Sequence, residues 1–135
     1  MEKSLGAVPS RTIEVFDAFK RAFETGQTFD FLKKVVEGFH FFIPLPIEGW
    51  NHEQQGKERF EELIRFERSV LQVQLTPLIM LENGDNGMVI FRAEGSLSGQ
   101  PYRNELAVVF EYEAEGIRSF REYVGMPLKS YESPQ

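Results

Sequence analysis

The sequence has no cysteine at all, and its 135 residues include only two histidines and one tryptophan. Without cysteine the chain cannot form a disulfide, a thiolate metal site or a cysteine nucleophile. No segment approaches the apolar length of a membrane span, and residues 1–10 lack the apolar run of a signal peptide. These absences favour a cytoplasmic protein that does not enter a membrane.

Positive charge is also scarce, because 15 lysines and arginines face 21 aspartates and glutamates, giving a formal net charge of −6. The acidic residues are spread along the chain, so its field repels nucleic acid and anionic membrane surfaces. His40 and His52 have no third ligand at metal spacing, and no phosphate-binding loop or nucleotide-binding glycine pattern is present. We expect no nucleic-acid partner, no metal and no cofactor.

Phenylalanine, by contrast, is abundant, with 13 copies in the chain. These side chains can build a large apolar interior or line an apolar cavity. The length is that of one ordinary domain. We expect a single domain over residues 1–135, with a core of about residues 10–127 between a loose N-terminal lead-in and a loose C-terminal tail.

Apolar periodicity predicts helices in the first half of the chain and strands in the second. One helix follows Ser10 and ends at Gly26, a short one runs from Thr28 to Gly38, and a third begins near Lys57. Strands are expected at residues 39–43, 71–82, 88–97, 102–113 and 117–124, with a bulge or edge position at Pro77. Helices ahead of a continuous antiparallel run indicate an α+β fold. The long strands are apolar on both faces, so we expect a second copy to cover the outer face in a homodimer.

A charged pair interrupts one of these strands, where the sequence reads GMVIFRAEGSLSG. Arg92 and Glu94 are two residues apart, so their side chains point to the same face of the strand. The pair could be a solvated surface pair, a buried structural ion pair or part of a site.

Four stretches, in this order and spacing, are typical of one group of proteins: FHFFIPLP, GKERFEEL, GSLSGQPYRNELAVVFEYEAEGI and REYVG. The chain resembles the SnoaL-like (polyketide cyclase-like) and ketosteroid-isomerase-like proteins of the nuclear transport factor 2-like superfamily. The resemblance implies a cone-shaped, curved antiparallel sheet closed by three helices, an apolar pocket between them, and in many members a homodimer. The superfamily hosts isomerases, cyclases, hydrolases, dehydratases and non-catalytic binders, so the fold does not fix the function.

The chain is similar in more detail to limonene-epoxide-hydrolase-like enzymes. In those enzymes an arginine bridges two carboxylates, of which one activates water and the other protonates the epoxide oxygen. The corresponding positions here are Arg92, Glu94 and, on the last strand, Glu122. The resemblance implies that Glu122 is the base, Glu94 the acid and Arg92 the bridge. The water-holding pair of that branch corresponds to His40 and Phe42, of which only His40 can bind water.

The chemistry of such a cluster follows from its charges. Two carboxylates in one apolar pocket cannot both ionise cheaply, so one pKa rises, and an arginine between them sets their geometry. A base and an acid near neutral pH suit isomerisation, hydrolysis or cyclisation. The alternative is a buried ion pair that satisfies only itself. In the same way, His40 could orient a ligand or be a hydrogen-bonded core histidine.

Six aromatic side chains are candidates for the pocket wall: Phe16, Phe19, Phe42, Trp50, Phe60 and Phe120. The helical stripe that contains Phe16 and Phe19 is interpreted first as core and second as pocket wall, and Trp50 can be a lid or a plug. We expect a cofactor-free acid/base enzyme of isomerase, cyclase or epoxide-hydrolase type that acts on a small apolar molecule. A non-catalytic ligand-binding or dimerisation module of the same fold is the alternative.

Overall fold

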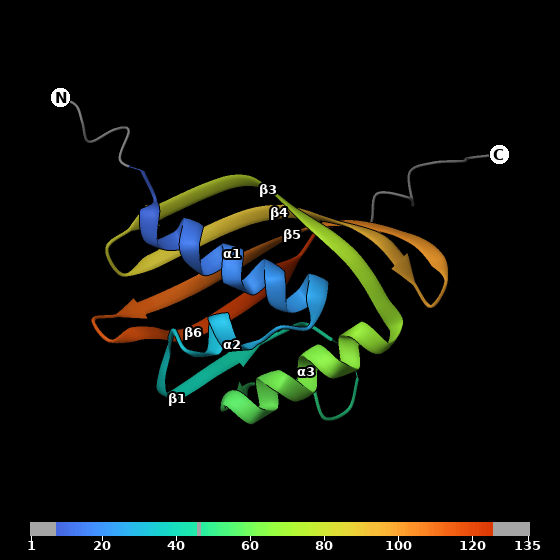
Figure 1. Ribbon diagram of the computed structural model, residues 1–135, viewed down its shortest axis with the longest axis horizontal. Helices are drawn as coiled ribbons and strands as arrows, with labels where there is room; N and C mark the ends of the chain where they lie inside the picture. The colour runs from blue at the N-terminus through green and yellow to red at the C-terminus, as the bar shows by residue number, and fades with distance from the viewer. Residues whose placement is uncertain (1–7, 46, 126–135) are drawn as a thin grey trace.

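The computed structural model describes residues 8–45 and 47–125. The predicted lead-in and tail fall on residues 1–9 and beyond 127, which lie almost entirely outside the described residues. Along the described chain two helices are followed by two strands, a third helix and four further strands, as Figure 1 shows. The helices are α1 (Ser10–Thr25), α2 (Phe29–Leu32) and α3 (Lys57–Val70). The strands are β1 (Val35–Phe42), β2 (Gln54–Gln55), β3 (Leu71–Asn83), β4 (Asn86–Leu97), β5 (Gln100–Glu113) and β6 (Gly116–Val124).

All the described strands belong to one sheet, in the order β2-β1-β6-β5-β4-β3. Strands β3 to β6 form the predicted antiparallel meander, and β1 adds to it by pairing parallel to β6. The sheet curves, and α1 lies across its concave face while α3 runs along one end (Figure 1). The predicted α+β fold, a curved sheet closed by helices, is confirmed.

The prediction for Pro77 is also confirmed, because β3 is an edge strand whose register with β4 shifts between Pro77 and Ile79. Proline lacks the N–H that a central strand would need, so an edge bulge accommodates it. Nearby, the backbone N–H of Leu75 donates to Glu24 Oε2 at 2.7 Å. This hydrogen bond ties the C-terminal turn of α1 to the edge strand.

The second helix is shorter than predicted. It ends at Leu32, and Val35 and Val36 begin β1 instead of extending a helical stripe to Gly38. Both valines are β-branched and suit a strand, and β6 offers Val35 a parallel partner at Ile117. Gly38 has φ +82° inside β1, where the register with β6 shifts, so it marks an irregularity within the strand.

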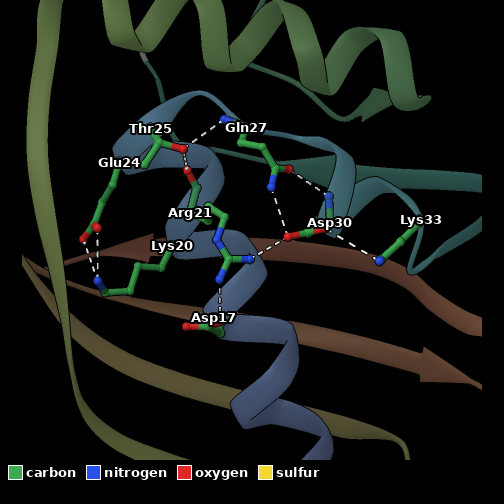
Figure 2. A network of polar contacts seen from close by, with 8 residues as sticks. All are labelled: Asp17, Lys20, Arg21, Glu24, Thr25, Gln27, Asp30 and Lys33. Atoms are coloured by element: carbon green, nitrogen blue, oxygen red, sulfur yellow. Dashed lines mark hydrogen bonds and ion pairs between the residues drawn. The ribbon is translucent and has the colours of Figure 1, made fainter.

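A polar network fixes the turn between α1 and α2 (Figure 2). Arg21 donates to Asp30 at 2.6 Å and to Asp17 at 3.0 Å, and the side chain of Gln27 donates to Asp30 at 3.0 Å. Gly26 ends α1 in the left-handed backbone conformation, which residues other than glycine rarely adopt. These contacts lie on the surface, so each stabilises the turn only modestly.

Phenylalanines fill the space between the helices and the concave face. Phe19 is fully buried, and its ring contacts Phe110 and Phe120 edge-to-face, with centroids 5.5 and 5.3 Å apart. Phe31 and Phe60 continue this cluster toward α2 and α3. No helix in the described part of the chain is long and apolar enough to cross a membrane.

Candidate active site

A cavity of about 240 Å³ lies at the end of the sheet where α3 meets β3. Its walls come from α3, the first half of β3, the middle and far end of β4, and the facing parts of β5 and β6. Almost all of the lining is apolar, and the polar side chains in it are Glu67, Tyr102 and Glu122. The apolar lining consists of Phe23, Ile43, Pro44, Leu45, Ile47, Phe66, Val70, Leu71, Val73, Leu75, Phe91, Ala93, Leu97, Leu106 and Val124.

Strand alternation places Glu122 in this cavity. In β6 the side chains of Phe120 and Glu122 are buried against the concave face, while those of Arg121 and Tyr123 are exposed on the other. Glu122 pairs with Val108 of β5, and its side chain is only 8% exposed. An acidic side chain that is buried to this extent is normally paired with a cation or a hydrogen-bond donor.

Glu122 has no such partner among residues 8–45 and 47–125: no described group forms a hydrogen bond or ion pair with its carboxyl. Burial raises the pKa of Glu122 well above its ordinary value, and the negative charge of Glu67 raises it further. Both effects favour the protonated carboxyl, which can donate its proton.

Glu67 reaches the same cavity from the last turns of α3. Loss of hydration raises its pKa to about 7. Tyr102 lies opposite on β5, and its pKa is raised by loss of hydration and, less strongly, by Glu122 and Glu67. Asn104 Nδ2 donates to the Tyr102 hydroxyl at 3.3 Å, so the hydroxyl proton is free for another acceptor. The cavity thus gathers two titrating carboxyls and one phenol.

The predicted arginine bridge is not formed. Arg92 and Glu94 occupy the alternate positions of β4 and project from the outer face, whereas Phe91 and Ala93 face the cavity. Arg92 Nη2 donates to Glu105 Oε2 at 3.4 Å, and Glu94 pairs with Arg103 at 3.2 Å. The prediction that Arg92 links Glu94 to Glu122 is therefore wrong, because the sheet itself separates them.

His40 also lies away from the cavity. Its Nδ1 is 2.8 Å from Glu53 Oε2, and the other oxygen of Glu53 accepts a hydrogen bond from Arg121 at 3.0 Å. These side chains are on the outer face at the β1–β6 edge and are well exposed. His40 is therefore neither a core histidine nor a neighbour of Glu122, and its predicted role beside that carboxyl lacks the required geometry.

None of the six aromatic side chains predicted for the pocket lines this cavity. Phe16, Phe19, Phe60 and Phe120 are fully buried in the phenylalanine cluster. This agrees with the interpretation of the stripe of Phe16 and Phe19 as core, whereas the pocket prediction for Phe60 and Phe120 is wrong because their rings pack inside the cluster. The remaining two are Phe42 and Trp50. The ring of Phe42 lies on the outer side of the sheet, 4.7 Å from the guanidinium of Arg121.

Trp50 does not line the cavity but packs behind a residue that does. It stacks on Phe66, which does line the cavity, with the ring centroids 6.0 Å apart. The guanidinium of Arg59 covers it, 3.6 Å from the ring, and donates to the Gly49 carbonyl. Trp50 therefore packs behind the wall and supports the loop that follows β1, without forming a lid over the cavity.

Sequence reasoning missed Glu67 and Tyr102. A signal for Glu67 was present, because Phe60, Leu63 and Ile64 form the apolar stripe of α3 and the next position of that stripe is Glu67. A charged residue at a core-facing position of a helix is a candidate site residue, as is a charged residue inside an apolar strand. Tyr102 gave no comparable signal, because it follows a turn.

Solved structures show what the chain is similar to. An NTF2-like protein from Anabaena variabilis is 28% identical, with a TM-score of 0.78, over 93% of this chain and 95% of that one. A protein with a ketosteroid-isomerase-like fold from Catenulispora acidiphila, solved in complex with trimethylamine, is 15% identical, with a TM-score of 0.68, over 82% of this chain and 84% of its own. SalBIII, an epoxide hydrolase/cyclase-like enzyme of pyran ring formation in salinomycin, is 17% identical, with a TM-score of 0.68, over 87% of this chain and 92% of its own.

No protein-family model matches the chain, and no curated protein matches it. The likeness is therefore carried by three-dimensional structure, which covers nearly the whole of both chains in each comparison. The chain has the fold of the nuclear transport factor 2-like and ketosteroid-isomerase-like proteins, as its sequence patterns predicted.

Proposed function

We propose that the chain is a cofactor-free acid/base enzyme that binds a compact, mainly apolar molecule in the cavity and moves protons with Glu122 and Glu67. The observation that carries this proposal is the buried carboxyl of Glu122, which faces the cavity without a partner among the described residues. Burying an unpaired carboxyl costs folding free energy, and an apolar side chain would fill the same place at no such cost. Groups of this kind concentrate at sites that bind or transform ligands.

The raised pKa values give the two carboxyls different roles. Burial and the charge of Glu67 raise the pKa of Glu122 and favour its protonated form, so Glu122 serves as the general acid, while Glu67, with a pKa of about 7, is partly ionised near neutral pH and serves as the base. A substrate held between them loses a proton to one carboxyl and gains one from the other, which is the chemistry of isomerisation. With an epoxide, Glu122 protonates the leaving oxygen while Glu67 activates the attacking hydroxyl or water. Tyr102 can orient the substrate by donating its hydroxyl proton to an oxygen.

This assignment differs from the one that the sequence predicted. Glu67 takes the place of Glu94 as the second carboxyl, and Glu122 becomes the acid instead of the base. Neighbours of the fold include the epoxide hydrolase/cyclase-like enzyme SalBIII, which supports acid/base chemistry by analogy.

The test is turnover of a panel of small epoxides, enones and hydroxy-ketones by the wild type and by Glu122→Gln and Glu67→Gln. We expect each variant to lose about 100-fold or more in kcat/KM, the usual contribution of a positioned proton donor or acceptor. We also expect kcat/KM to rise with pH through about 7 as Glu67 ionises and to fall at higher pH as Glu122 ionises.

Glu94→Gln is the matched control, because it makes the same substitution on the outer face of the sheet. Its activity should equal that of the wild type. If Glu122→Gln turned over the same compounds as fast as Glu94→Gln does, the acid/base proposal would be wrong.

A non-catalytic binding module is the second candidate function. It is favoured by the absence, among the described residues, of any hydrogen bond that holds the Glu122 carboxyl in one orientation, since catalysis depends on fixed geometry. Such a module would bind the panel compounds and convert none of them. Binding measured by calorimetry, together with product analysis after long incubation, separates the two functions.

We also propose that two copies pair through the outer face of the sheet. Ile79 and Leu81 of β3 and Tyr123 of β6 are about half exposed there, beside charges of both signs on Arg92 and Glu105. A face that carries both apolar and oppositely charged groups can complement its own copy. Light scattering should give the mass of a dimer for the wild type and of a monomer for Ile79→Glu/Leu81→Glu. A monomeric wild type at micromolar concentration would contradict the proposal.

A further inference from the structure

The charge balance of the cavity distinguishes it from an ordinary apolar pocket. Among the described residues, two carboxyls and one phenol line it, with no lysine, arginine or histidine. The Glu122 side chain is 8% exposed, and no described group pairs with it. The polar side chains that the described lining offers therefore all end in oxygen.

The arginine side chains of the surrounding elements form hydrogen bonds or ion pairs with groups outside the cavity. Arg68 follows Glu67 on α3, but its guanidinium donates to the backbone carbonyl of Glu24 at 2.6 Å and thereby caps α1. Arg121, next to Glu122 in the chain, points to the outer face and pairs with Glu53, and Arg92 pairs there with Glu105. The positive charge that two buried carboxyls would attract is therefore not supplied by these residues.

The walls of the cavity indicate which kind of positively charged ligand can bind in it. Their side chains are aliphatic or aromatic, and Phe66, Phe91 and Tyr102 provide aromatic surface of the type that attracts organic cations. The volume of about 240 Å³ is below that of sites for drug-sized ligands, which begin at roughly 300 Å³. A strongly hydrated metal ion does not match such walls, whereas a compact alkylated amine does.

We propose that the ligand of this cavity is a compact apolar amine, bound as the ammonium between Glu67 and Glu122 with its alkyl groups against the aliphatic and aromatic walls. The proposal deepens the proposed function and rests on the same site, because it names the substrate class on which the two carboxyls act. A substrate with a basic nitrogen places its charge between the carboxyls and holds its reacting carbon atoms beside them.

Proton release is the signature of this arrangement. In the empty cavity the pKa values of Glu67 and Glu122 are raised by burial, and that of Glu122 also by the charge of Glu67. A bound cation favours the ionised form of Glu67 and so expels its proton, while Glu122 keeps the proton that it donates in the proposed reaction. By linkage the cation binds more tightly as pH rises through about 7. Tyr102 is the other titrating group in the lining, and its raised pKa keeps it protonated near neutral pH.

The experiment is isothermal titration calorimetry near neutral pH with N,N-dimethylpiperidinium, a permanently charged probe, and with neutral cyclohexanone, a ring compound of similar size. Titrations in phosphate and in Tris, whose ionisation enthalpies differ, report the protons released. Because the quaternary probe cannot titrate, every proton released comes from the protein. We expect it to bind about tenfold or more tightly than cyclohexanone, which corresponds to one desolvated charge contact, and to release protons.

Three variants assign the effect. Glu67→Gln should weaken binding of the quaternary probe about tenfold and abolish the proton release. Glu122→Gln should weaken binding less and leave the proton release from Glu67 in place, while Glu94→Gln should change neither. Circular dichroism confirms that each variant is folded. Equal or tighter binding of cyclohexanone, binding of the cation without proton release, or no binding of the cation by the folded wild type would each overturn the proposal.

These outcomes are separate from those of the proposed function. If Glu122 is required for turnover of a neutral substrate but the cation does not bind, the amine inference fails and the acid/base function stands. If the cation binds with proton release and no compound is converted, the inference stands and the enzymatic proposal fails.

Discussion

Glu94 and Glu122 are the same residue type on two strands of one sheet, yet they occupy opposite environments. The Glu94 side chain is 48% exposed on the outer face and pairs with Arg103 across β4 and β5. Glu122 is 8% exposed on the concave face and has no partner in the described part of the chain. The two residues lie on opposite faces of the sheet, on strands that flank β5.

The two faces of the sheet differ in where the arginine side chains lie. On the outer face, Arg92, Arg103, Arg118 and Arg121 each lie beside a glutamate. The last three are about half exposed, whereas the Nε of Arg92 is buried. Exposed pairs of this kind keep the face soluble and contribute little free energy of folding. On the concave face the carboxyls of the cavity are left without arginine, so burial raises their pKa values. The chemistry therefore resides on the face that lacks the conspicuous charge pairs.

The largest difference between the faces should appear when one phenylalanine is truncated on each. Phe120→Ala empties a fully buried position in the aromatic cluster and should lower the free energy of unfolding by about 3–5 kcal/mol. Phe42→Ala removes an outer-face ring that contacts the Arg121 guanidinium, and should cost about 1 kcal/mol. Urea unfolding measures both. Equal losses would mean that the outer ring is as buried in solution as the inner one.

A smaller difference concerns the pH dependence of stability. The folded-state pKa of Glu67, about 7, and that of Glu122 both lie above the ordinary value of 4.5. Their protonated forms therefore stabilise the fold fully below about pH 4.5, and this contribution is lost as pH rises through about 7 for Glu67 and further for Glu122. Each group contributes a slope of up to about 1.4 kcal/mol per pH unit, reduced where water reaches it.

Urea midpoints measured across this pH range test the effect. The wild type should lose stability as pH rises from 4.5 to 7, and Glu67→Gln/Glu122→Gln should lose less. Glu94→Gln, the outer-face control, should keep the wild-type slope. A double variant with the same slope as the wild type would show that neither carboxyl is desolvated in solution.

The smallest expected effect is that of an outer-face ion pair. Arg103→Ala removes the partner of Glu94, and both side chains are about half exposed. Water and salt screen such a pair, so the free energy of unfolding should change by about 1 kcal/mol or less. A double-mutant cycle with Glu94→Ala isolates the interaction. A coupling of several kcal/mol would show that the outer face is covered, as a dimer would cover it.

Most of the fold could be predicted from sequence, because periodicity reports which positions are buried. The apolar stripe of α1 between Ser10 and Gly26, the start of α3 at Lys57 and the edge bulge at Pro77 were all predicted. The error lay at Val35, where a helical reading and a strand reading fit the same short apolar run. Pairing with Ile117, far along the chain, decided the outcome.

Less of the site could be predicted. Glu122 was identified, and strand alternation correctly placed Arg92 and Glu94 together on one face. What alternation cannot give is which face of β4 corresponds to which face of β6, because this depends on register across β5. The structure pairs Arg92 with Glu105 and Glu122 with Val108, so the predicted partners lie on opposite faces.

The sequence by itself determined the elements, their order, the apolar interior and the presence of carboxyls at positions that should be buried, since these depend on local periodicity. Only the tertiary structure decided that Glu67 of α3 and Glu122 of β6, 55 residues apart (122 − 67), share one cavity, and that no arginine of the described residues lines it. Long-range register and the packing of a helix against the end of a sheet fix which side chains meet, and neither is encoded in any one segment.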